Sequence, residues 1–584
     1  MVDYESYSTN VSDNNVVVAA SSSNGLVSLA SRAKEGSGMS TVQGTIVGGD
    51  ARLETYRQEI TSGESIVGIE LGSTRIKACL ISADGTSLAA GEHTWENQWV
   101  DGHWTYSLDD IWSGLAASYA DLVRNTEKKF GTRPTSFKAM GISAMMHGYM
   151  AFDGNDNLLS PFRTWRDTTT GKAATELTEL LQVNIPLRWS VAHFYQAILS
   201  AEPHVPSIAS LTTLAGYVHY KLTDRKVLGV GDASGMFPID SSTSDYDQSL
   251  LDKFNAHTEP HLPGSDLREL LPEVLVAGTQ AGNLTEEGAK LLDSSGELDA
   301  GAVFCPPEGD AGTGMTATNS IRPRTGNISV GTSIFAMVVL EQPLRNLHHE
   351  IDMVTTPSGD AVAMVHCNNG ADELSRWIRL FCEVALAFGT RKKIDVDESY
   401  SALLNEALSS DASAGGILAY NNISGEPIMD LADGRPMVVR TPGSDLTLAN
   451  FMRAQIYSVF APLAISLEVL KDEDVSLDFL NAHGGLFKTA SVAQRFLAGA
   501  TGTPIVVSDS ASEGGAWGIA LLAAYLDHSD QPLNEFLDKR IFSDTKTHLL
   551  APKAKDAEGF KRYLFTYRHG LELQRIAAAS VNDA

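Results

Sequence analysis

Two turns in this chain combine glycine with hydroxyl side chains between apolar, strand-like segments. They are Gly72-Ser73-Thr74, within residues 66–81, and Gly331-Thr332-Ser333, within residues 327–340. Glycine permits a tight turn, and hydroxyl groups together with free backbone N–H groups can cradle phosphate oxygens. Ordinary β-hairpins use the same residue types. Because the strand–turn–strand pattern occurs twice, it nevertheless indicates a pair of turns that together bind a nucleotide.

An aspartate between two glycines is the candidate catalytic group. Asp232 lies in the segment GVGDASGMFPID at residues 229–240, where Gly231 and Gly235 flank it. A carboxylate within hydrogen-bond reach of a hydroxyl can accept its proton while a phosphoryl group arrives. A loop aspartate that makes an Asx-turn or caps a helix would leave the same pattern, so the pattern alone leaves both roles open.

The elements expected to position these groups alternate between strand and helix from Ser65 onward, as in an α/β fold. Ser107 followed by Asp110 predicts a capped helix start, and apolar residues recur after it at helical spacing. A strand at residues 139–144 ends just before His147. Open α/β sheets bind ligands at such strand ends.

Two glycine-rich segments mark the C-terminal half. They are Gly484-Gly485 after a strand, followed by Phe487 and Lys488, and Gly514, Gly515 and Gly518 in a helix expected from about Ala511. The first permits close backbone approach to a ribose and an α-phosphate, but it is also a common strand-to-helix turn. The second lets backbones approach closely, against another helix or against an adenine ring. Phe487 fits stacking and packing equally well.

Further motifs occur in a distinctive order along the chain. They are Met146-His147-Gly148, Thr164-Trp165-Arg166-Asp167, Gly231-Asp232-Ala233-Ser234-Gly235, PEGDAGTG at residues 307–314 and AHGGLFKTASVAQRF at residues 482–496. Together with the two glycine turns, they resemble the FGGY carbohydrate kinases, members of the actin-like ATPase superfamily that phosphorylate sugars and polyols with ATP. The resemblance runs from about residue 64 to about residue 570, and it is closest to the pentulose kinases.

This resemblance implies an α/β fold of two actin-like ATPase (ribonuclease H-like) domains with a cleft between them. The expected parts are a flexible N-terminal extension at 1–62, an N-terminal domain at 63–316 with the sugar site and the catalytic base, a C-terminal domain at 317–570 with the nucleotide site, and a tail at 571–584. Within the extension, residues 53–60 are expected to form a helix that docks on the core.

By the same resemblance, Asp232 is the general base and ATP and Mg²⁺ are the cofactors. The implied sugar-binding residues are His147, Trp165, Arg166, Asp167 and Asp232. The implied ATP- and phosphate-binding residues are Gly72, Ser73, Thr74, Arg75, Gly331, Thr332, Ser333, Gly484, Gly485 and Lys488. The implied metal-binding residues are Glu70 and Asp310. Arg75 and Lys77 could equally lie on a solvated strand face.

The chain departs from the family pattern at three places. Glu70 stands where Asp is usual, which leaves open whether it holds Mg²⁺ directly or through water. Arg166 stands where many relatives have Asn, and the segment at residues 213–217 also differs. These departures argue against D-xylulose, the commonest substrate.

Four longer segments resemble a subgroup associated with L-arabinose use. They are residues 95–112, 161–167, 184–199 and 211–223. We therefore expect phosphorylation of the terminal hydroxyl of a ketopentose, with L-ribulose favoured and D-xylulose as the alternative. Rival readings are a nucleotide-gated chaperone or filament protein, disfavoured because no client-binding domain follows residue 570, and a silent sugar sensor, disfavoured because Asp232 and Asp310 are retained.

Composition limits the partners. The 584 residues include 44 basic and 72 acidic ones, and the net charge of −28 would repel nucleic acid and anionic membranes. The sequence contains no long uninterrupted apolar run, so it predicts no membrane span. Four scattered cysteines predict buried thiols in a reducing cytoplasm. The expected partner is a small-molecule sugar, with no nucleic acid and no membrane, and a homodimer stays an open expectation.

Overall fold

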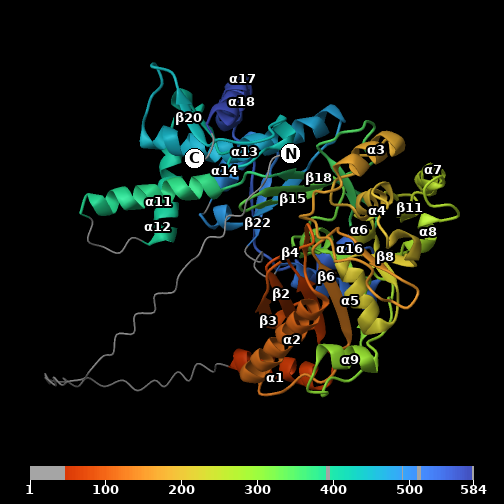
Figure 1. The fold of residues 1–584 in the computed structure, drawn as a ribbon. Helices are drawn as coiled ribbons and strands as arrows, with labels where there is room; N and C mark the ends of the chain where they lie inside the picture. Colours follow the sequence, from red (N-terminus) through yellow and green to blue (C-terminus); the bar gives the residue numbers. More distant parts are fainter. Residues whose placement is uncertain (1–46, 390–394, 490, 509–513, 582–584) are drawn as a thin grey trace, which may run out of the picture. The chain divides into compact units, whose positions relative to one another are not determined.

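The computed structural model describes residues 47–389, 395–489, 491–508 and 514–581. It is a mixed α/β protein built on two mixed β-sheets, each flanked by helices (Figure 1). This architecture confirms the predicted α/β class.

The first sheet combines an antiparallel meander with parallel strands. Its strands, in spatial order, are β13 (Val303–Phe304), β6 (Ala139–Ala144), β1 (Ile66–Leu71), β2 (Arg75–Ile81) and β3 (Ser87–Thr94), and β14 (Glu308–Gly309) also pairs with β6. β1 is antiparallel to β2 and parallel to β6, with Leu71 opposite Ala144. The first glycine turn and the segment leading to His147 therefore leave the sheet at the same edge.

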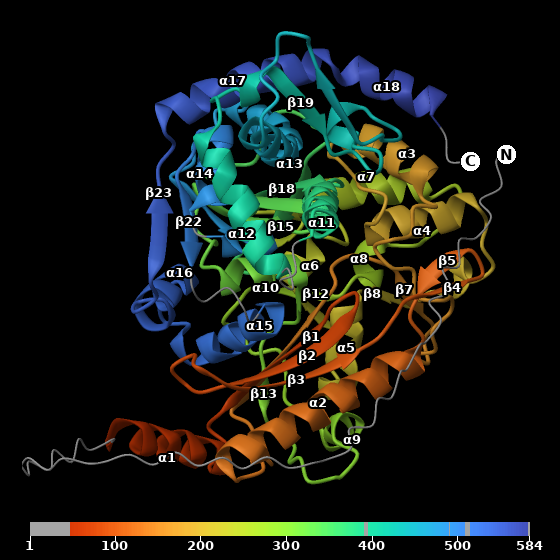
Figure 2. The ribbon, with the colours of Figure 1, turned by 90° about the vertical axis from the view of Figure 1, so that its left-hand side faces the viewer.

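Helix α2 (Leu108–Phe130) packs along β2 and β3 (Figure 2). The Ser107 hydroxyl caps its start by accepting a hydrogen bond from the backbone N–H of Asp110 at 3.0 Å, which confirms the predicted helix start. Gly91 allows the close approach, because a Cβ there would lie 2.2 Å from the backbone nitrogen of Leu122. A larger residue on β3 would push the helix away from the sheet.

The second sheet repeats the plan of the first. Its strands, in spatial order, are β17 (Asp352–Thr355), β18 (Ala361–Cys367), β16 (Ile334–Val339), β15 (Thr325–Val330), β21 (Phe479–His483), β22 (Ile505–Ser508) and β23 (Thr547–Leu550). Helices α13 (Leu448–Asp472) and α14 (Val492–Thr501) pack with it in one hydrophobic core. By length and composition α13 could cross a membrane, but 78% of its apolar window is buried. The apolar side chains of α13 pack in the core of the second sheet.

Helices α10 (Asp310–Ala317) and α15 (Gly514–Tyr525) pack closely on each other and on the first sheet. A Cβ on Gly518 would lie 2.1 Å from the carbonyl oxygen of Thr313, and one on Gly68 would lie 2.1 Å from that of Ala516. Of the two alternatives for the glycine-rich helix, the structure shows close packing of backbones. Ala511, its expected start, lies outside the described residues.

Helix α1 (Val47–Thr61) includes the helix expected at residues 53–60. Ile60 is buried in the core beneath the first sheet, and Tyr56 packs against the same core. The last part of the predicted extension is therefore a docked helix. Residues 1–46, for which flexibility was predicted, lie outside the described residues.

The other elements complete the layers around the two sheets. The remaining α-helices are α3 (Gly171–Leu181), α4 (Ser190–Leu199), α5 (Leu214–Thr223), α6 (Val230–Ala233), α7 (Gln248–Thr258), α8 (Leu267–Leu270), α9 (Glu286–Leu292), α11 (Asp372–Ala387), α12 (Val396–Glu406), α16 (Leu533–Phe536), α17 (Ala554–His569) and α18 (Leu571–Ser580). The short strands are β4 (Gln98–Val100), β5 (His103–Thr105), β7 (Met150–Phe152), β8 (Ser210–Thr212), β9 (Val227–Gly229), β10 (Ile239–Asp240), β11 (Asp245–Tyr246), β12 (Glu273–Leu275), β19 (Ile417–Tyr420) and β20 (Met437–Arg440).

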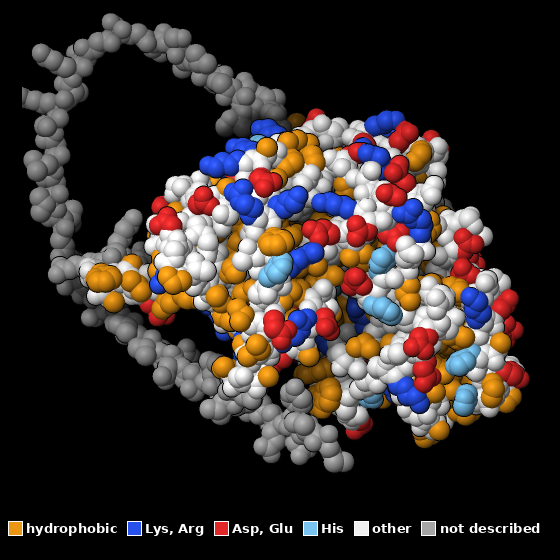
Figure 3. All heavy atoms as spheres, turned by 90° about the horizontal axis from the view of Figure 1, so that it is seen from above, with side chains coloured by type: hydrophobic (Ala, Val, Ile, Leu, Met, Phe, Trp, Pro, Cys, Tyr) orange, Lys and Arg blue, Asp and Glu red, His pale blue; other side chains and the backbone are white. Residues whose placement is uncertain are grey.

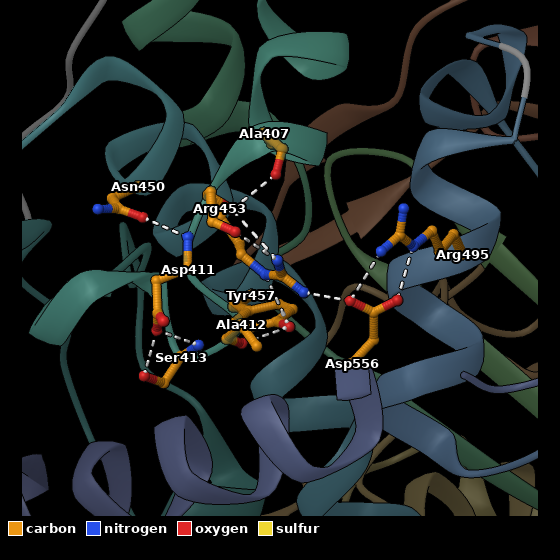
Figure 4. Close-up of polar contacts among 10 residues, drawn as sticks. Ala407, Asp411, Ala412, Ser413, Asn450, Arg453, Tyr457, Arg495 and Asp556 are labelled. Atoms are coloured by element: carbon orange, nitrogen blue, oxygen red, sulfur yellow. Dashed lines mark hydrogen bonds and ion pairs between the residues drawn. The ribbon is translucent and has the colours of Figure 1, made fainter. Parts of the chain in front are cut away.

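A buried ion network joins α13, α14 and α17 (Figure 4). Arg453 of α13 and Arg495 of α14 donate to opposite oxygens of Asp556 at 2.5 and 2.6 Å. The Arg453 guanidinium also donates to the hydroxyl of Tyr457 at 2.9 Å. Burial raises the pKa of Asp556, but the two guanidinium groups outweigh it and hold that pKa below its usual range. The carboxylate therefore serves as the counter-ion of both arginines.

Surface charge and cysteines agree with the composition only in part. On the face drawn in Figure 3, Asp and Glu side chains are spread over most of the surface, and several Lys and Arg side chains lie close together in the upper left of the view. Cys79, Cys305 and Cys367 are buried thiols, as predicted, whereas Cys382 on α11 is only half-buried. The expectation of four buried thiols is thus wrong at Cys382, because the outer face of α11 is exposed.

Candidate active site

Asp232 lies on α6, a single helical turn that follows β9. Its side chain is only 1% exposed. The hydroxyl of Thr213 donates to Oδ2 at 2.6 Å, while Oδ1 is buried and has no hydrogen-bond partner among the described residues. Buried acceptors are nearly always paired, so Oδ1 is available to an incoming hydroxyl group.

The environment of Asp232 suits proton transfer near neutral pH. Burial and the neighbouring carboxylate of Asp310 raise the pKa of Asp232 to about 7, against the hydrogen bond from Thr213. A general base works best when its pKa lies near the working pH. Of the two roles left open for Asp232, this geometry favours the base over a cap, because neither carboxylate oxygen accepts a hydrogen bond from a described helix N–H.

Two further residues contact Asp232 that sequence reasoning missed. Thr213 comes from the turn before α5, and Glu308 comes from β14 and accepts a hydrogen bond from the backbone N–H of Asp232 at 2.9 Å. Burial and the Asp232 carboxylate raise the pKa of Glu308 to about 8. The only sequence signal for Glu308 was its place two residues before Asp310 in PEGDAGTG.

The two predicted metal-binding carboxylates lie near each other. Asp310 begins α10, and its Oδ1 accepts a hydrogen bond from the backbone N–H of Met146 at 3.2 Å. Burial and the charge of Glu70 raise the pKa of Asp310 to about 6. Burial also raises the pKa of Glu70, although Lys77 and the backbone N–H groups of Gly515 and Ala516 oppose the change.

These contacts bear on how a metal ion could be held. Within the described ranges, no group of three Asp, Glu, His or Cys side chains could ligate a metal ion. Glu70 is already engaged by Lys77, its partner on β2, and by the start of α15. A carboxylate oxygen of Asp310 therefore fits Mg²⁺ better than Glu70 does, and Mg²⁺ keeps several waters in such sites.

The first glycine turn is clamped by aromatic side chains. The indole N–H of Trp165 donates to Ser73 Oγ at 3.1 Å, and the hydroxyl of Tyr106 donates to the Ser73 carbonyl oxygen at 2.6 Å. A residue predicted for the sugar and one predicted for phosphate thus meet. Gly72 has no positive φ, and a Cβ there would lie 3.2 Å from the Arg75 carbonyl oxygen. Its N–H closes the turn onto the Arg75 carbonyl oxygen at 2.9 Å.

The structure separates the two cations that follow this turn. Arg75 is exposed and its guanidinium pairs with Glu92 at 3.1 Å, whereas Lys77 lies beside Glu70. Thr74 is exposed at the tip. Lys77, which was not among the predicted phosphate ligands, is therefore closer to the carboxylate cluster than Arg75 is.

The second glycine turn meets the Gly484-Gly485 segment. β15 and β21 are parallel neighbours with Ser329 opposite His483, so the turns that follow them are adjacent. Gly484 has φ +115, and a Cβ there would lie 2.2 Å from the Val330 carbonyl oxygen, which makes glycine necessary. Gly331, like Gly72, has no positive φ.

The space around these turns is open. The nearest atom to a Cβ on Gly331 would be 3.9 Å away, and a Cβ on Gly485 would meet nothing within 4 Å. Thr332 and Lys488 are exposed, and Ser333 is half-buried. Phe487 is buried in the core of the second sheet, so packing is its role. The backbone here has room for a phosphate group or a ribose.

His147 follows β6 and lies beside the loop that carries Asp232. It has φ +74, and its ring stacks on that of Trp189 with centroids 6.4 Å apart. Gly235 makes room for it, because a Cβ there would lie 2.6 Å from His147 Nδ1. Burial and the charge of Arg188 hold the pKa of His147 well below its usual range. Its imidazole is therefore neutral and able to hydrogen-bond a sugar hydroxyl.

Asp167 and Arg166 face different surroundings. The buried Asp167 carboxylate pairs with His103 of β5 and accepts a hydrogen bond from the Thr169 hydroxyl at 2.6 Å. Arg166 is exposed, and its guanidinium lies 4.9 Å from the ring centroid of Trp104, also on β5. Both residues therefore connect the β4–β5 hairpin to residues 164–167, the segment that was predicted to bind the sugar. His103 and Trp104 are further residues that sequence reasoning missed.

A cavity with a volume of about 440 Å³ separates elements of the two halves of the chain. Its lining includes Arg188 from the segment before α4 and Asp352 and His366 from the second sheet. Arg188 also forms an ion pair with Asp352. None of the residues predicted for the sugar or the nucleotide lines this cavity.

Comparison with known proteins identifies the fold and the chemistry. A model of the FGGY family of carbohydrate kinases, N-terminal domain, matches residues 65–295, and the C-terminal domain of the same family matches residues 326–526. The chain belongs to the FGGY family of carbohydrate kinases. Its fold is the actin-like two-domain kinase fold, and its reaction is the ATP-dependent phosphorylation of a carbohydrate. The predicted boundary at residues 316 and 317 falls between the two matches and stays a prediction.

Individual relatives of this FGGY kinase are distant. A xylulose kinase of Haemophilus influenzae is 23% identical over 373 residues, which cover 61% of this chain and 69% of the relative. A xylulose kinase of Staphylococcus epidermidis is 22% identical over 471 residues, which cover 79% and 88%. The structure of a ligand-bound xylulose kinase from Lactobacillus acidophilus matches with a TM-score of 0.70 at 19% identity, covering 88% of this chain and 99% of that one. Identities this low show a shared fold.

Proposed function

We propose that this FGGY kinase transfers a phosphoryl group from ATP to the terminal hydroxyl of a ketopentose, with D-xylulose as the first candidate. The observation that carries the proposal is the buried, unpartnered Oδ1 of Asp232. D-xylulose is favoured because the relatives described above are named xylulose kinases. The expectation of L-ribulose finds no support in these comparisons, and the alternative reading is the better one.

In the proposed mechanism, Asp232 Oδ1 accepts the proton of the sugar hydroxyl late in the transfer. Thr213 holds the other oxygen and keeps the carboxylate oriented. His147, whose imidazole is neutral, binds and orients the sugar together with Trp165, Arg166 and Asp167. ATP supplies the phosphoryl group, and the two glycine turns with Gly484 and Gly485 hold its phosphates through backbone N–H groups.

We assign Mg²⁺ to Asp310, with Glu70 acting through water. Asp310 offers a carboxylate at the start of α10, and its charge contributes to the raised pKa of Asp232. The ion would neutralise charge on the phosphates when bound. Cytoplasmic location and a homodimer stay predictions.

A coupled ADP-release assay over a panel of sugars tests the proposed function. We expect D-xylulose to have the highest kcat/KM, and L-ribulose to be lower by roughly tenfold to a hundredfold because its hydroxyl configuration leaves buried polar groups unpaired. D-ribulose, L-xylulose, ribitol, glycerol and gluconate complete the panel. A higher kcat/KM for L-ribulose would instead support the resemblance to the subgroup associated with L-arabinose use. No stimulation by any pentulose would point to a different polyol or sugar acid.

The pH dependence of the reaction follows from the raised pKa of Asp232. A base must be ionised to accept a proton, and the pKa of Asp232 lies at about 7, so the inactive protonated form dominates at lower pH. We expect kcat/KM for the sugar to fall about tenfold per pH unit below about pH 7. The measurement is a pH profile at saturating ATP and Mg²⁺. A flat profile down to about pH 5 would mean that no group of this pKa acts as the base.

A further inference from the structure

The helical turn that carries Asp232 lacks a side-chain cap of its own. α6 spans only Val230–Ala233, and its N-cap residue is Gly229, which has no side chain. The backbone N–H groups in the first turn of a helix have no partner within the helix, and a Ser, Thr, Asp or Asn side chain at the N-cap usually accepts from them. Gly231 and Asp232 therefore need an acceptor from elsewhere.

Glu308 provides that acceptor. Its Oε2 accepts a hydrogen bond from the backbone N–H of Asp232 at 2.9 Å, and its Oε1 accepts one from that of Gly231 at 3.3 Å. The side chain is 1% exposed, and its strand β14 is held by pairing with β6. One carboxyl group thus spans two neighbouring N–H groups of the turn.

The turn is shaped around this carboxyl group. A Cβ on Gly229 would lie 2.2 Å from Glu308 Oε1, and one on Gly231 would lie 2.4 Å from Oε2. Contacts this short do not occur for real side chains, so Glu308 can sit where it does only because both positions are glycine. The backbone N–H of Gly229 also donates to the carbonyl oxygen of Pro307 at 2.8 Å, which aligns β9 with the segment before Glu308.

The opposite end of the turn is held independently. The hydroxyl of Thr355 on β17 donates to the carbonyl oxygen of Val230 at 3.0 Å. The backbone N–H of Thr355 donates to Ser234 Oγ at 3.1 Å. Loss of Glu308 would therefore loosen the N–H end of α6 while its carbonyl end stays attached to the second sheet, so the turn would shift without unfolding.

We infer that Glu308 is a positioning residue for phosphoryl transfer, which caps α6 from β14 and thereby fixes Asp232 with Oδ1 facing the sugar hydroxyl. This inference rests on the proposed role of Asp232 as the base. It assigns to Glu308 no contact with sugar, nucleotide or metal. Its effect is exerted through the two backbone N–H groups of the turn.

The first test uses Glu308→Ala and Glu308→Gln in the full-length protein. We expect Glu308→Ala to lower kcat by about tenfold to a hundredfold, the usual cost of displacing a catalytic group by about 1 Å, with KM for ATP unchanged. Glu308→Gln fills the same volume and keeps one acceptor oxygen, so its loss is expected to be smaller. Melting temperatures of both variants show that the fold persists. Full kcat in Glu308→Ala, or in Glu308→Gln where the Ala variant fails to fold, would overturn the inference.

The second test separates positioning from a general structural role. Glu308→Ala is combined with Asp232→Asn, and kcat is measured for the four members of the cycle. If Glu308 acts through Asp232, the Ala substitution has no further effect once the base is gone. An equal loss in both backgrounds would overturn the inference. Full activity of Asp232→Asn by itself would instead overturn the proposed function, so the two failures are distinguishable.

A steric variant tests the fit itself. Gly231→Ala alone places a methyl group against Glu308 Oε2 and is expected to lower kcat. With Glu308→Ala present, the obstacle is gone, and the double variant is expected to be no slower than Glu308→Ala alone. Losses that multiply would show that Gly231 and Glu308 do not share this contact.

Discussion

Replacement of Asp232 by Asn is expected to lower kcat by about two to four decades, the usual contribution of acid–base catalysis. Asn has the same shape and can still accept the hydrogen bond that Thr213 donates at 2.6 Å. It cannot take up the proton of the sugar hydroxyl at neutral pH. Oδ1 is buried and has no partner in the described part of the chain, so the substitution removes the proton acceptor and breaks no hydrogen bond of that atom.

The measurement is single-variant kinetics in the coupled ADP-release assay, with KM for ATP as a check that the nucleotide site is intact. Asp240→Asn is the matched control, because it makes the same chemical change eight residues later in the same segment, where Asp240 accepts a hydrogen bond from the backbone N–H of Ser242 at 2.8 Å. The control is expected to keep normal turnover. Near-normal turnover of Asp232→Asn would exclude Asp232 as the base.

Replacement of Asp556 by Ala is expected to destabilise the protein by about 3–5 kcal/mol, the cost of leaving a buried charge without its partner. The Arg453 side chain is 1% exposed and donates to Asp556 at 2.5 Å (Figure 4). Without the carboxylate, the guanidinium keeps only neutral partners such as Tyr457. The free energy of unfolding from urea titration measures the effect.

The control for this prediction is an exposed ion pair in the same helices. Glu468 of α13 pairs with Arg568 of α17, and both side chains are more than 40% exposed. Glu468→Ala is expected to cost about 0–1 kcal/mol, as is usual for pairs in water. Equal effects of the two substitutions would show that the Asp556 network contributes no more than a surface pair.

The pH dependence of the Asp556 contribution has a definite sign. Because the pKa of Asp556 is below its usual range in the folded state, its contribution to stability is present above the unfolded pKa of about 4 and is lost as the pH falls through the folded value. Acid unfolding of Asp556→Ala should therefore begin from a lower stability but be less steep. The buried network thus makes the second domain sensitive to strong acid.

Local sequence patterns predicted the elements that depend on neighbouring residues. The start of α2 at Ser107 could be predicted because a cap and its N–H partner are three residues apart. The two glycine turns could be predicted because strand, turn and strand are contiguous. The Asp232 segment stood out because glycines flank the carboxylate. These features are encoded within about ten residues.

Contacts between distant segments were beyond such patterns. Arg75 and Lys77 lie two residues apart on β2 and so share one face of the strand. Only the pairing of β2 with β3 and β1 placed Arg75 against Glu92 and Lys77 beside Glu70. The glycines of α15 predicted that another group approaches this helix closely, but the sequence did not show which one. In the structure, Gly518 lies against the backbone of α10 at Thr313. The expected preference for L-ribulose also found no support among the relatives. Short motifs are poor guides to the sugar, because hydroxyl configuration is recognised by side chains assembled from several elements.

The sequence by itself determined the family and the α/β class and singled out Asp232 as the candidate base, because each depends on short contiguous motifs. Tertiary structure alone decided what surrounds that carboxylate. Thr213 and Glu308 lie 19 and 76 residues from Asp232 in the chain. They reach it because β14 pairs with β6 and because α5, which Thr213 caps, packs against both β6 and β9. Burial, hydrogen bonding and the resulting pKa of Asp232 are therefore properties of the packed fold.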